Sequence, residues 1–389
     1  MGMKFVIFIL MLTVVLVQAR LNFWKDLMFS QKAIINYLFP KDPGIVRVRK
    51  PEEVKTAVNN VTTMDFIGLV ERYGYSAEEH YVTTEDGYIL TIHRISASPL
   101  CKGRQKRGVI FFQNGLLSSS DLWVLTGPGK DLAFLLADEG YDIWLGNYRG
   151  NTYCRSHIKL SSRDRDFWQY SYHEIGTRDL PAMIDYVLSN TKQKFLRYSN
   201  RELGNLSDRS AYRYTVLSRL NATRFLSAET CYCLLFISYY IHFYYNLCVY
   251  IFDIYDYICS LTALPEILSY FPAGTSIPLL IHYYQNFVTK KFQTFDYGYF
   301  GNYKQYGQMT PIMYDLNKVT APLALFYGAN DVLAPVANVW ETYKRLPNVI
   351  LLEEIAYKLF SHTDFLFAID VKTLIYDRVI ELFQKIDNN

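Results

Sequence analysis

Gly108-Val-Ile-Phe-Phe-Gln-Asn-Gly-Leu-Leu117 is a run of β-branched and aromatic residues that stops at a glycine turn. A continuous apolar run of this length predicts a central strand of a parallel sheet, covered on both faces. Asp131–Ala137 then has helical spacing and is followed by Gly140, which suits a helix C-terminus. A second strand, Tyr141–Leu145, breaks at Gly146–Asn151. Strand, helix and strand predict a βαβ unit whose strands end in loops at one sheet edge, where open α/β sheets place their chemistry.

The same stretch resembles the acid lipase family, which comprises gastric and lysosomal lipases and their insect relatives. Three motifs carry the resemblance: Gln113–Leu117, Leu132–Asn147 and Arg149–Thr152. Similarity starts near Met64, continues to about Lys194, resumes at Leu264 and holds to the C-terminus. It therefore covers most of the chain apart from one internal segment.

The resemblance implies the α/β-hydrolase fold, a mostly parallel sheet with helices on both faces and a cap inserted after the nucleophile turn. It also implies hydrolysis of carboxylic esters of lipids, such as acylglycerols or steryl esters, by serine acyl transfer. The partner would be a lipid ester at a lipid–water interface, and no cofactor is implied. Near the start of the fold, Glu85-Asp86-Gly87 is the expected turn of a β-hairpin.

The composition is that of a globular protein, with 389 residues, a formal net charge of +3 and 50% apolar residues. This length is ample for a large core. No long basic run occurs, so nucleic-acid binding has little support. Six cysteines would permit disulfides in an oxidising compartment, but the sequence does not give their pairing. With no C-x-x-C pair and no histidine cluster, no metal site is expected.

Residues 1–19 are interpreted as a signal peptide. Lys4 precedes the apolar run Phe5–Val17, and Val17-Gln-Ala19 places small side chains at the cut. The alternative is a buried N-terminal helix. Glycosylation sequons at Asn60, Asn205 and Asn221 are compatible with secretion. The expected location is therefore secreted or lysosomal, with residues 20–389 forming a single domain.

A candidate acid and a candidate base follow two later strands. Ala321–Tyr327 is an apolar run that ends at Gly328-Ala-Asn-Asp331, and His362 opens the loop before the last helix. An acid at the carboxyl end of a parallel strand is well placed to orient a histidine, although a turn-capping Asp is the alternative. The resemblance implies that Asp331 fixes the imidazole tautomer and that His362 moves the proton. Asp331 before His362 also fits the chain order of this fold.

The turn after the first strand holds the candidate oxyanion donor. The resemblance assigns this role to the backbone amide of Leu116, which follows Asn114-Gly115. Family members usually carry His before that glycine, so Asn114 is a departure. Losing an oxyanion donor costs about 10²–10³ in rate.

The nucleophile is the missing part of the expected triad. An α/β-hydrolase needs G-x-S-x-G on the turn after the strand that Lys194–Tyr198 would form. Here Asn200 replaces the first glycine, Glu202 replaces the serine and only Gly204 remains. No G-x-S-x-G occurs anywhere in the sequence, so no nucleophile is identified. The alternative function is a catalytically inactive homologue that binds lipid or a partner.

The region of about 195–263 is atypical for the cap and the nucleophile turn. Cys231–Ala263 is crowded with Tyr, Phe, Ile and Leu. Residues 231–252 could be a membrane anchor. The polar and charged residues Asn246, Asp253 and Asp256 interrupt the apolar stretch, so no stable span is expected. Because A/T-rich triplets encode this composition, a retained intron is a further interpretation.

Overall fold

The computed structural model describes residues 45–49, 61–101, 107–200, 215–218, 264–331 and 333–387. Several sequence predictions lie outside these residues: the signal peptide (1–19), the sequons at Asn60, Asn205 and Asn221, the replacement Glu202, and the apolar stretch 231–252. Cys101 and Cys154 are described, and both are free thiols.

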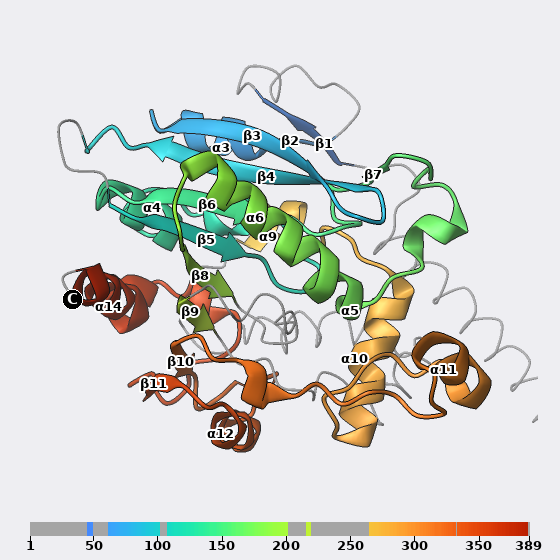
Figure 1. Ribbon diagram of the computed structural model, residues 1–389. Coiled ribbons are helices and arrows are strands. Elements are labelled where there is room, and N and C mark those ends of the chain that lie inside the picture. The colour runs from blue at the N-terminus through green and yellow to red at the C-terminus, as the bar shows by residue number, and fades with distance from the viewer. Residues whose placement is uncertain are drawn as a thin grey trace, which may run out of the picture.

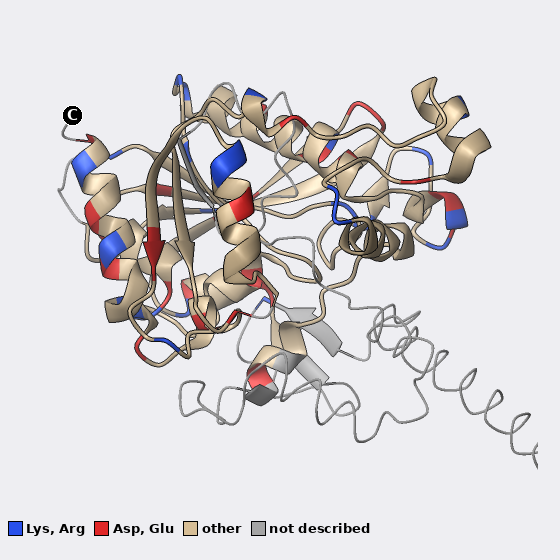
Figure 2. Ribbon diagram, turned by 90° about the horizontal axis from the view of Figure 1, so that it is seen from below, with Lys and Arg blue, Asp and Glu red and all other residues tan. Residues whose placement is uncertain are grey.

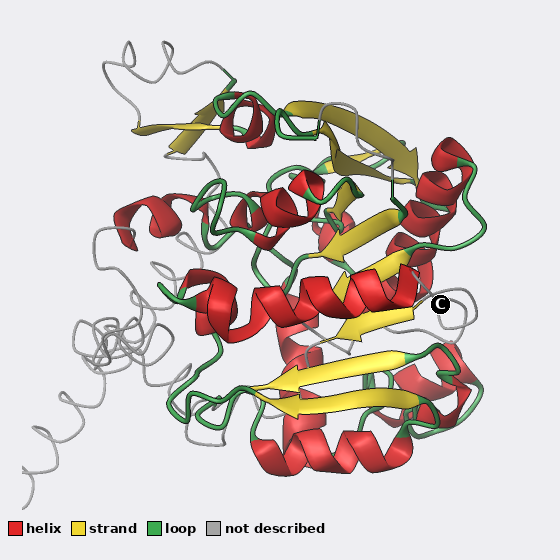
Figure 3. Cartoon of the chain, turned by 90° about the vertical axis from the view of Figure 1, so that its left-hand side faces the viewer, coloured by secondary structure: helices red, strands yellow, loops and turns green. Residues whose placement is uncertain are grey.

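A nine-stranded sheet forms the centre of the molecule, in the order β11-β10-β9-β8-β5-β6-β4-β3, with β7 beside β4. The six strands from β11 to β6 are parallel, as their arrows show in Figure 3, and β4 is antiparallel to its neighbours. The bounds are β3 Ser76–Thr83, β4 Tyr88–Ala97, β5 Val109–Gln113, β6 Asp142–Gly146, β7 Ser156–His157, β8 Arg197–Asn200, β9 Thr215–Ser218, β10 Leu323–Tyr327 and β11 Val349–Glu354. A separate parallel pair joins β1 Ile45–Val48 to β2 Val61–Met64.

Helices lie on both faces of this sheet, as expected for an α/β fold (Figure 1). Their bounds are α3 Phe66–Glu71, α4 Leu132–Asp138, α5 Tyr172–Glu174, α6 Leu180–Thr191, α9 Leu264–Tyr270, α10 Ile277–Thr289, α11 Gly298–Tyr306, α12 Val336–Arg345, α13 Asp364–Phe367 and α14 Asp377–Asp387. Among helices in the described ranges, none is both long and apolar enough to cross a bilayer. Basic and acidic residues are interspersed over the described ribbon (Figure 2).

Alternation along the strands divides the core into two layers. On β5, Ile110 and Phe112 pack in one apolar cluster with residues of α3, α4 and α14. Val109 and Phe111 pack in the other cluster, with residues of α6, α10 and α12. Successive side chains of a strand point to opposite faces, so a run with no polar residue requires apolar partners on both. The predicted central strand is thereby confirmed.

Strand register brings the functional loops to one edge. Gln113, the last residue of β5, pairs with Gly146 at the end of β6 and with Asn200 at the end of β8. Asn200 in turn pairs with Ser218 at the end of β9. Both β8 and β9 come from the region of about 195–263 that was expected to hold an atypical cap and nucleophile turn. β8 overlaps the predicted strand Lys194–Tyr198, whereas Thr215–Ser218 was not expected to be a strand.

Candidate active site

Asp331 and His362 meet beyond the carboxyl end of β10. The Nδ1 atom of His362 lies 3.2 Å from Oδ1 and 3.1 Å from Oδ2 of Asp331. Asp331 is 3% exposed, and its Oδ1 accepts the backbone N–H groups of Leu333 (3.0 Å) and Ala334 (2.8 Å). The carboxylate therefore has a fixed orientation toward the imidazole. The structure brings together the two side chains that the sequence analysis paired, and their catalytic roles stay a prediction.

Gly328 allows the two loops to approach. A Cβ atom at this position would lie 2.2 Å from the carbonyl oxygen of Phe360. The N–H of Asn330 donates to that same oxygen at 3.3 Å. Any larger residue at position 328 would push the Asp331 loop away from the His362 loop, because a carbonyl oxygen of the backbone cannot move aside.

The loop that carries His362 is anchored on both sides of the histidine. The backbone N–H of Ser361 donates to Oδ2 of Asp364 at 2.6 Å. The ring of Phe360, which is fully buried, meets the edge of Phe365 with centroids 4.6 Å apart. These contacts restrain the backbone around His362 without using its ring, so the ring can serve the contact with Asp331.

The Asn114–Ser118 turn, which contains Leu116, leaves the sheet from β5. The carbonyl oxygen of Gly115 accepts the hydroxyl groups of Ser118 (2.6 Å) and Tyr148 (2.8 Å). The side-chain amide of Asn114 donates to the Ser118 carbonyl oxygen. Leu117 has a φ of +60°, a left-handed conformation that a non-glycine residue adopts only when its surroundings impose it. The turn is thus held rigidly by polar contacts.

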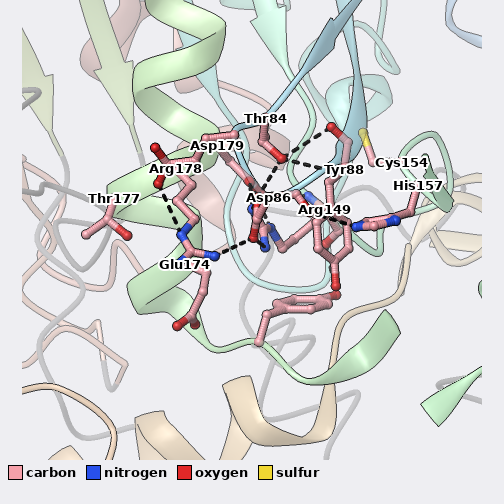
Figure 4. Close-up of polar contacts among 12 residues, drawn as sticks. Thr84, Asp86, Tyr88, Arg149, Cys154, His157, Glu174, Thr177, Arg178 and Asp179 are labelled. Carbon is pink, nitrogen blue, oxygen red and sulfur yellow. Dashed lines mark hydrogen bonds and ion pairs between the residues drawn. The ribbon is translucent and has the colours of Figure 1, made fainter. Parts of the chain in front are cut away.

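A buried ion cluster fixes the loop after β6 (Figure 4). Arg149 is 1% exposed, and its guanidinium contacts Asp179 at 2.6 Å and Asp86 at 2.7 Å. Burial would lower the pKa of Arg149, but the charges and hydrogen bonds of the two carboxylates outweigh it and raise that pKa. The same contacts hold the pKa of Asp86 well below its usual range, against the effect of burial. The cluster ties the hairpin turn to the start of α6.

Two histidines among the aromatic residues have structural contacts. Nδ1 of His173 lies 2.8 Å from the hydroxyl of Tyr314. His282 is fully buried against the ring of Tyr172, and its Nε2–H donates to the Gln293 carbonyl oxygen at 2.8 Å. Burial lowers the pKa of His282 to about 3, so this ring is neutral. In the described ranges, no three His, Cys, Asp or Glu residues gather as a metal site would require.

The polar network behind the Asn114–Ser118 turn was not predicted from the sequence. It links His93 on β4 to Ser120 and Asn147, all of them fully buried. The partners of Arg149 were not predicted either. The sequence signal for His93 was its position within a strand. A histidine that faces the core from a strand requires polar partners.

Comparisons with known proteins agree with this architecture. The model of the partial α/β-hydrolase lipase region matches residues 66–127. Lipase 1 of Drosophila melanogaster is 34% identical over 84% of this chain and 81% of its own length. Human gastric triacylglycerol lipase is 31% identical over 83% of this chain and 92% of its own length.

Among solved structures, an esterase from Exiguobacterium antarcticum aligns with a TM-score of 0.51 at 11% identity. The alignment covers 79% of this chain and all of the esterase. At this identity the likeness concerns the fold alone. Identity with the lipases over most of both chains goes further, and the chain belongs to the acid lipase family of α/β-hydrolases, a family of carboxylic ester hydrolases.

Proposed function

We propose that this chain acts on carboxylic esters of lipids, such as acylglycerols or steryl esters, with His362 as general base and Asp331 as the acid that orients it. The observation that carries the proposal is the contact of 3.1 Å between Nδ1 of His362 and the buried carboxylate of Asp331. A carboxylate at Nδ1 selects the tautomer that has its proton there, and it stabilises the imidazolium once Nε2 takes up a proton. Nε2 would be the nitrogen that moves protons in the reaction.

The amide of Leu116 is the proposed oxyanion donor. It belongs to the turn after β5, whose last residue pairs directly with Asn200 at the end of β8. In this fold the nucleophile turn follows that strand, and the amide after the nucleophile supplies a second donor. The proposed acid, base and first donor thus come from loops at the carboxyl ends of parallel strands.

A second candidate function is lipid or partner binding without catalysis. The specific observation in its favour is the absence of G-x-S-x-G from the sequence, with Glu202 in place of the serine. Serine acyl transfer needs a hydroxyl that becomes acylated and is then released by water. A carboxylate at that position cannot follow the same route, since acylating it would give an anhydride.

A serine-directed fluorophosphonate and a short-chain ester separate the two functions. Stoichiometric labelling together with release of the fatty acid would support hydrolysis by the chain as it stands. No labelling and no release would refute that activity and favour the binding function. The assay needs the purified full chain and a parallel sample of His362→Ala, which should neither label nor hydrolyse.

Secretion or lysosomal targeting belongs to the same proposal. It rests on the signal-peptide pattern of residues 1–19 and on the three sequons. The rival is a protein anchored through residues 231–252. Alkaline carbonate extraction of membranes decides between them, because an anchored chain stays in the pellet while a released chain enters the supernatant.

A further inference from the structure

A second array of Ser, His and Glu side chains lies behind the Asn114–Ser118 turn. Oγ of Ser120 is 2.7 Å from Nδ1 of His93, and Nε2 of His93 is 3.4 Å from Oε2 of Glu79. Ser120 and His93 both have no exposed surface. No substrate can reach this serine in the folded protein, so the array is not a second active site and requires another explanation.

The amide of Asn147 and the carboxylate of Glu79 favour one direction for the hydrogen bonds of this array. Nδ2 of Asn147 can only donate, and it lies 3.0 Å from Oγ of Ser120. Ser120 therefore accepts from Asn147. Nδ2 of Asn147 also lies 3.4 Å from Nδ1 of His93, which favours an unprotonated Nδ1 that accepts the proton of the Ser120 hydroxyl. In this arrangement the proton of His93 is on Nε2, which faces Glu79. The contact with His93 is the largest cause that lowers the pKa of Glu79, to about 2, so Glu79 is a carboxylate that favours this tautomer.

The ring of His93 is also held mechanically. It stacks on Phe66 with centroids 4.3 Å apart and planes 1° from parallel. Tyr153 meets it edge-on at 4.6 Å. These two contacts hold the plane of the ring in place, with Nδ1 toward Ser120 and Nε2 toward Glu79.

The array continues to the turn that holds the proposed oxyanion donor. Oδ1 of Asn147 accepts the backbone N–H of Ser120 at 3.0 Å and the side-chain amide of Asn151 at 2.8 Å. The same Asn151 amide reaches the carbonyl oxygen of Ser118 at 3.4 Å. That oxygen also accepts from Asn114. A continuous path of polar contacts therefore runs from Glu79 on β3 to both ends of the Asn114–Ser118 turn.

We propose that Glu79, His93 and Ser120 are positioning residues that set the Asn114–Ser118 turn through Asn147 and Asn151. Glu79 fixes the His93 tautomer, His93 orients the Ser120 hydroxyl, and Ser120 orients the Asn147 amide. The catalytic consequence rests on the proposed function, because the turn matters to hydrolysis only if the Leu116 amide binds the oxyanion. The positioning itself is independent of catalysis and is tested without it.

Hydrogen–deuterium exchange of the full chain gives the direct test. Glu79 is the most informative site for substitution, because its side chain is 24% exposed and lies at the end of the path that is farthest from the Asn114–Ser118 turn. Glu79→Ala removes the carboxylate that faces Nε2 of His93, whereas Glu79→Gln keeps an oxygen there. We expect Glu79→Ala to speed exchange of the amides in residues 114–119 by at least about fivefold, because His93 loses the carboxylate that favours its tautomer and the polar contacts of the turn weaken. Glu79→Gln should leave it near the wild-type rate.

Ser120→Ala is the second variant, with Tyr75→Phe as its matched control. Tyr75 is 4% exposed and donates its hydroxyl to Asp138 at 2.8 Å, so its change also removes a buried hydrogen bond. We expect faster exchange of residues 114–119 in Ser120→Ala alone, with β10 protected equally in both. Should Ser120→Ala fail to fold, the comparison of Glu79→Ala with Glu79→Gln still tests the proposal. If residues 114–119 exchange at the wild-type rate in Glu79→Ala, the proposal is wrong.

An ester hydrolysis assay distinguishes a failure of this inference from a failure of the proposed function. If the wild-type chain hydrolyses an ester, Glu79→Ala should lower kcat at least about tenfold with little change in KM, and Glu79→Gln should restore it. If exchange responds as expected while the wild-type chain has no activity, the proposed function fails and the positioning role stands. Unchanged exchange in Glu79→Ala refutes the positioning role whatever the activity.

Discussion

Nδ1 of His362 lies 3.1 Å from Oδ2 of Asp331, although the two residues are 31 positions apart in the chain. The strands β10 and β11 are parallel neighbours, so the loops that follow them emerge at the same edge of the sheet. Gly328 then lets those loops touch, because its missing Cβ makes room for the Phe360 carbonyl oxygen. The acid–base pair is therefore built by sheet topology and one glycine rather than by a local motif.

The first prediction concerns the missing nucleophile. The double substitution N200G/E202S restores G-x-S-x-G, beginning at the last residue of β8. That residue pairs with the last residue of β5, which directly precedes the Asn114–Ser118 turn. We expect this variant to be labelled by the fluorophosphonate at the serine introduced at position 202 and to hydrolyse a short-chain ester faster than the wild-type chain does, because the substitution supplies a serine to the proposed base and oxyanion donor. Labelling is measured by mass shift of the intact protein. The single variant N200G is the control, and a double variant that folds without labelling would contradict the prediction.

The second prediction tests Asp331 within the N200G/E202S background. Asp331→Asn keeps the size of the side chain, but an amide can donate to Nδ1 and so favours the wrong imidazole tautomer. We expect kcat to fall by about 10⁴, as when the acid of a triad is replaced by its amide. Asp370→Asn, at an exposed carboxylate, should leave kcat unchanged. Equal rates for the two variants would remove Asp331 from the proposed machinery.

The sequence predicted the centre of the fold because its signals there are local. The uninterrupted apolar run at Val109–Phe112 requires burial on both faces, and the two core clusters show that burial. The hairpin turn at Glu85–Gly87 was also predicted correctly, since Gly87 has a φ of +96° between β3 and β4. The pairing of Asp331 with His362 came from family resemblance and chain order, and the structure brings these side chains into contact.

Long-range polar contacts could not be predicted in the same way. Nothing in the local pattern predicts that Arg149 contacts Asp86, because they are 63 positions apart and the contact depends on how the hairpin folds over the loop after β6. The strand Thr215–Ser218 was missed for a related reason. It is only four residues long, and it is a strand through pairing with β8 and β10 on either side.

The third prediction concerns the buried ion cluster. Arg149→Met keeps the length of the side chain but leaves Asp179, which is fully buried, without its cation. Removing one partner of a buried ion pair costs about 3–5 kcal/mol in the free energy of unfolding. We expect a loss of this size in urea denaturation followed by fluorescence. Arg163→Met, at an exposed arginine, should change the free energy by less than about 0.5 kcal/mol. Similar midpoints for both variants would show that the cluster is not stabilising.

The last prediction is a dependence of stability on pH that originates at Asp131. This carboxyl group is 3% exposed, accepts the N–H of Gly127 at 2.7 Å and accepts the hydroxyl of Thr126. Burial raises its pKa from 3.8 to about 7, against the effect of these hydrogen bonds. The folded state therefore binds this proton more tightly than the unfolded state, and the stability it provides is full below about pH 4 and is lost as pH rises through 7.

Asp131→Asn checks this assignment because an amide has no proton to lose in that range. A separation of about three pKa units corresponds to roughly 4 kcal/mol at most. We expect the wild-type free energy of unfolding to fall between pH 4 and pH 7 relative to that of Asp131→Asn. Urea denaturation at four pH values measures the difference, with Asp370→Asn as the exposed control. A difference between wild type and Asp131→Asn that stays constant over this range would mean that Asp131 ionises normally in the folded protein.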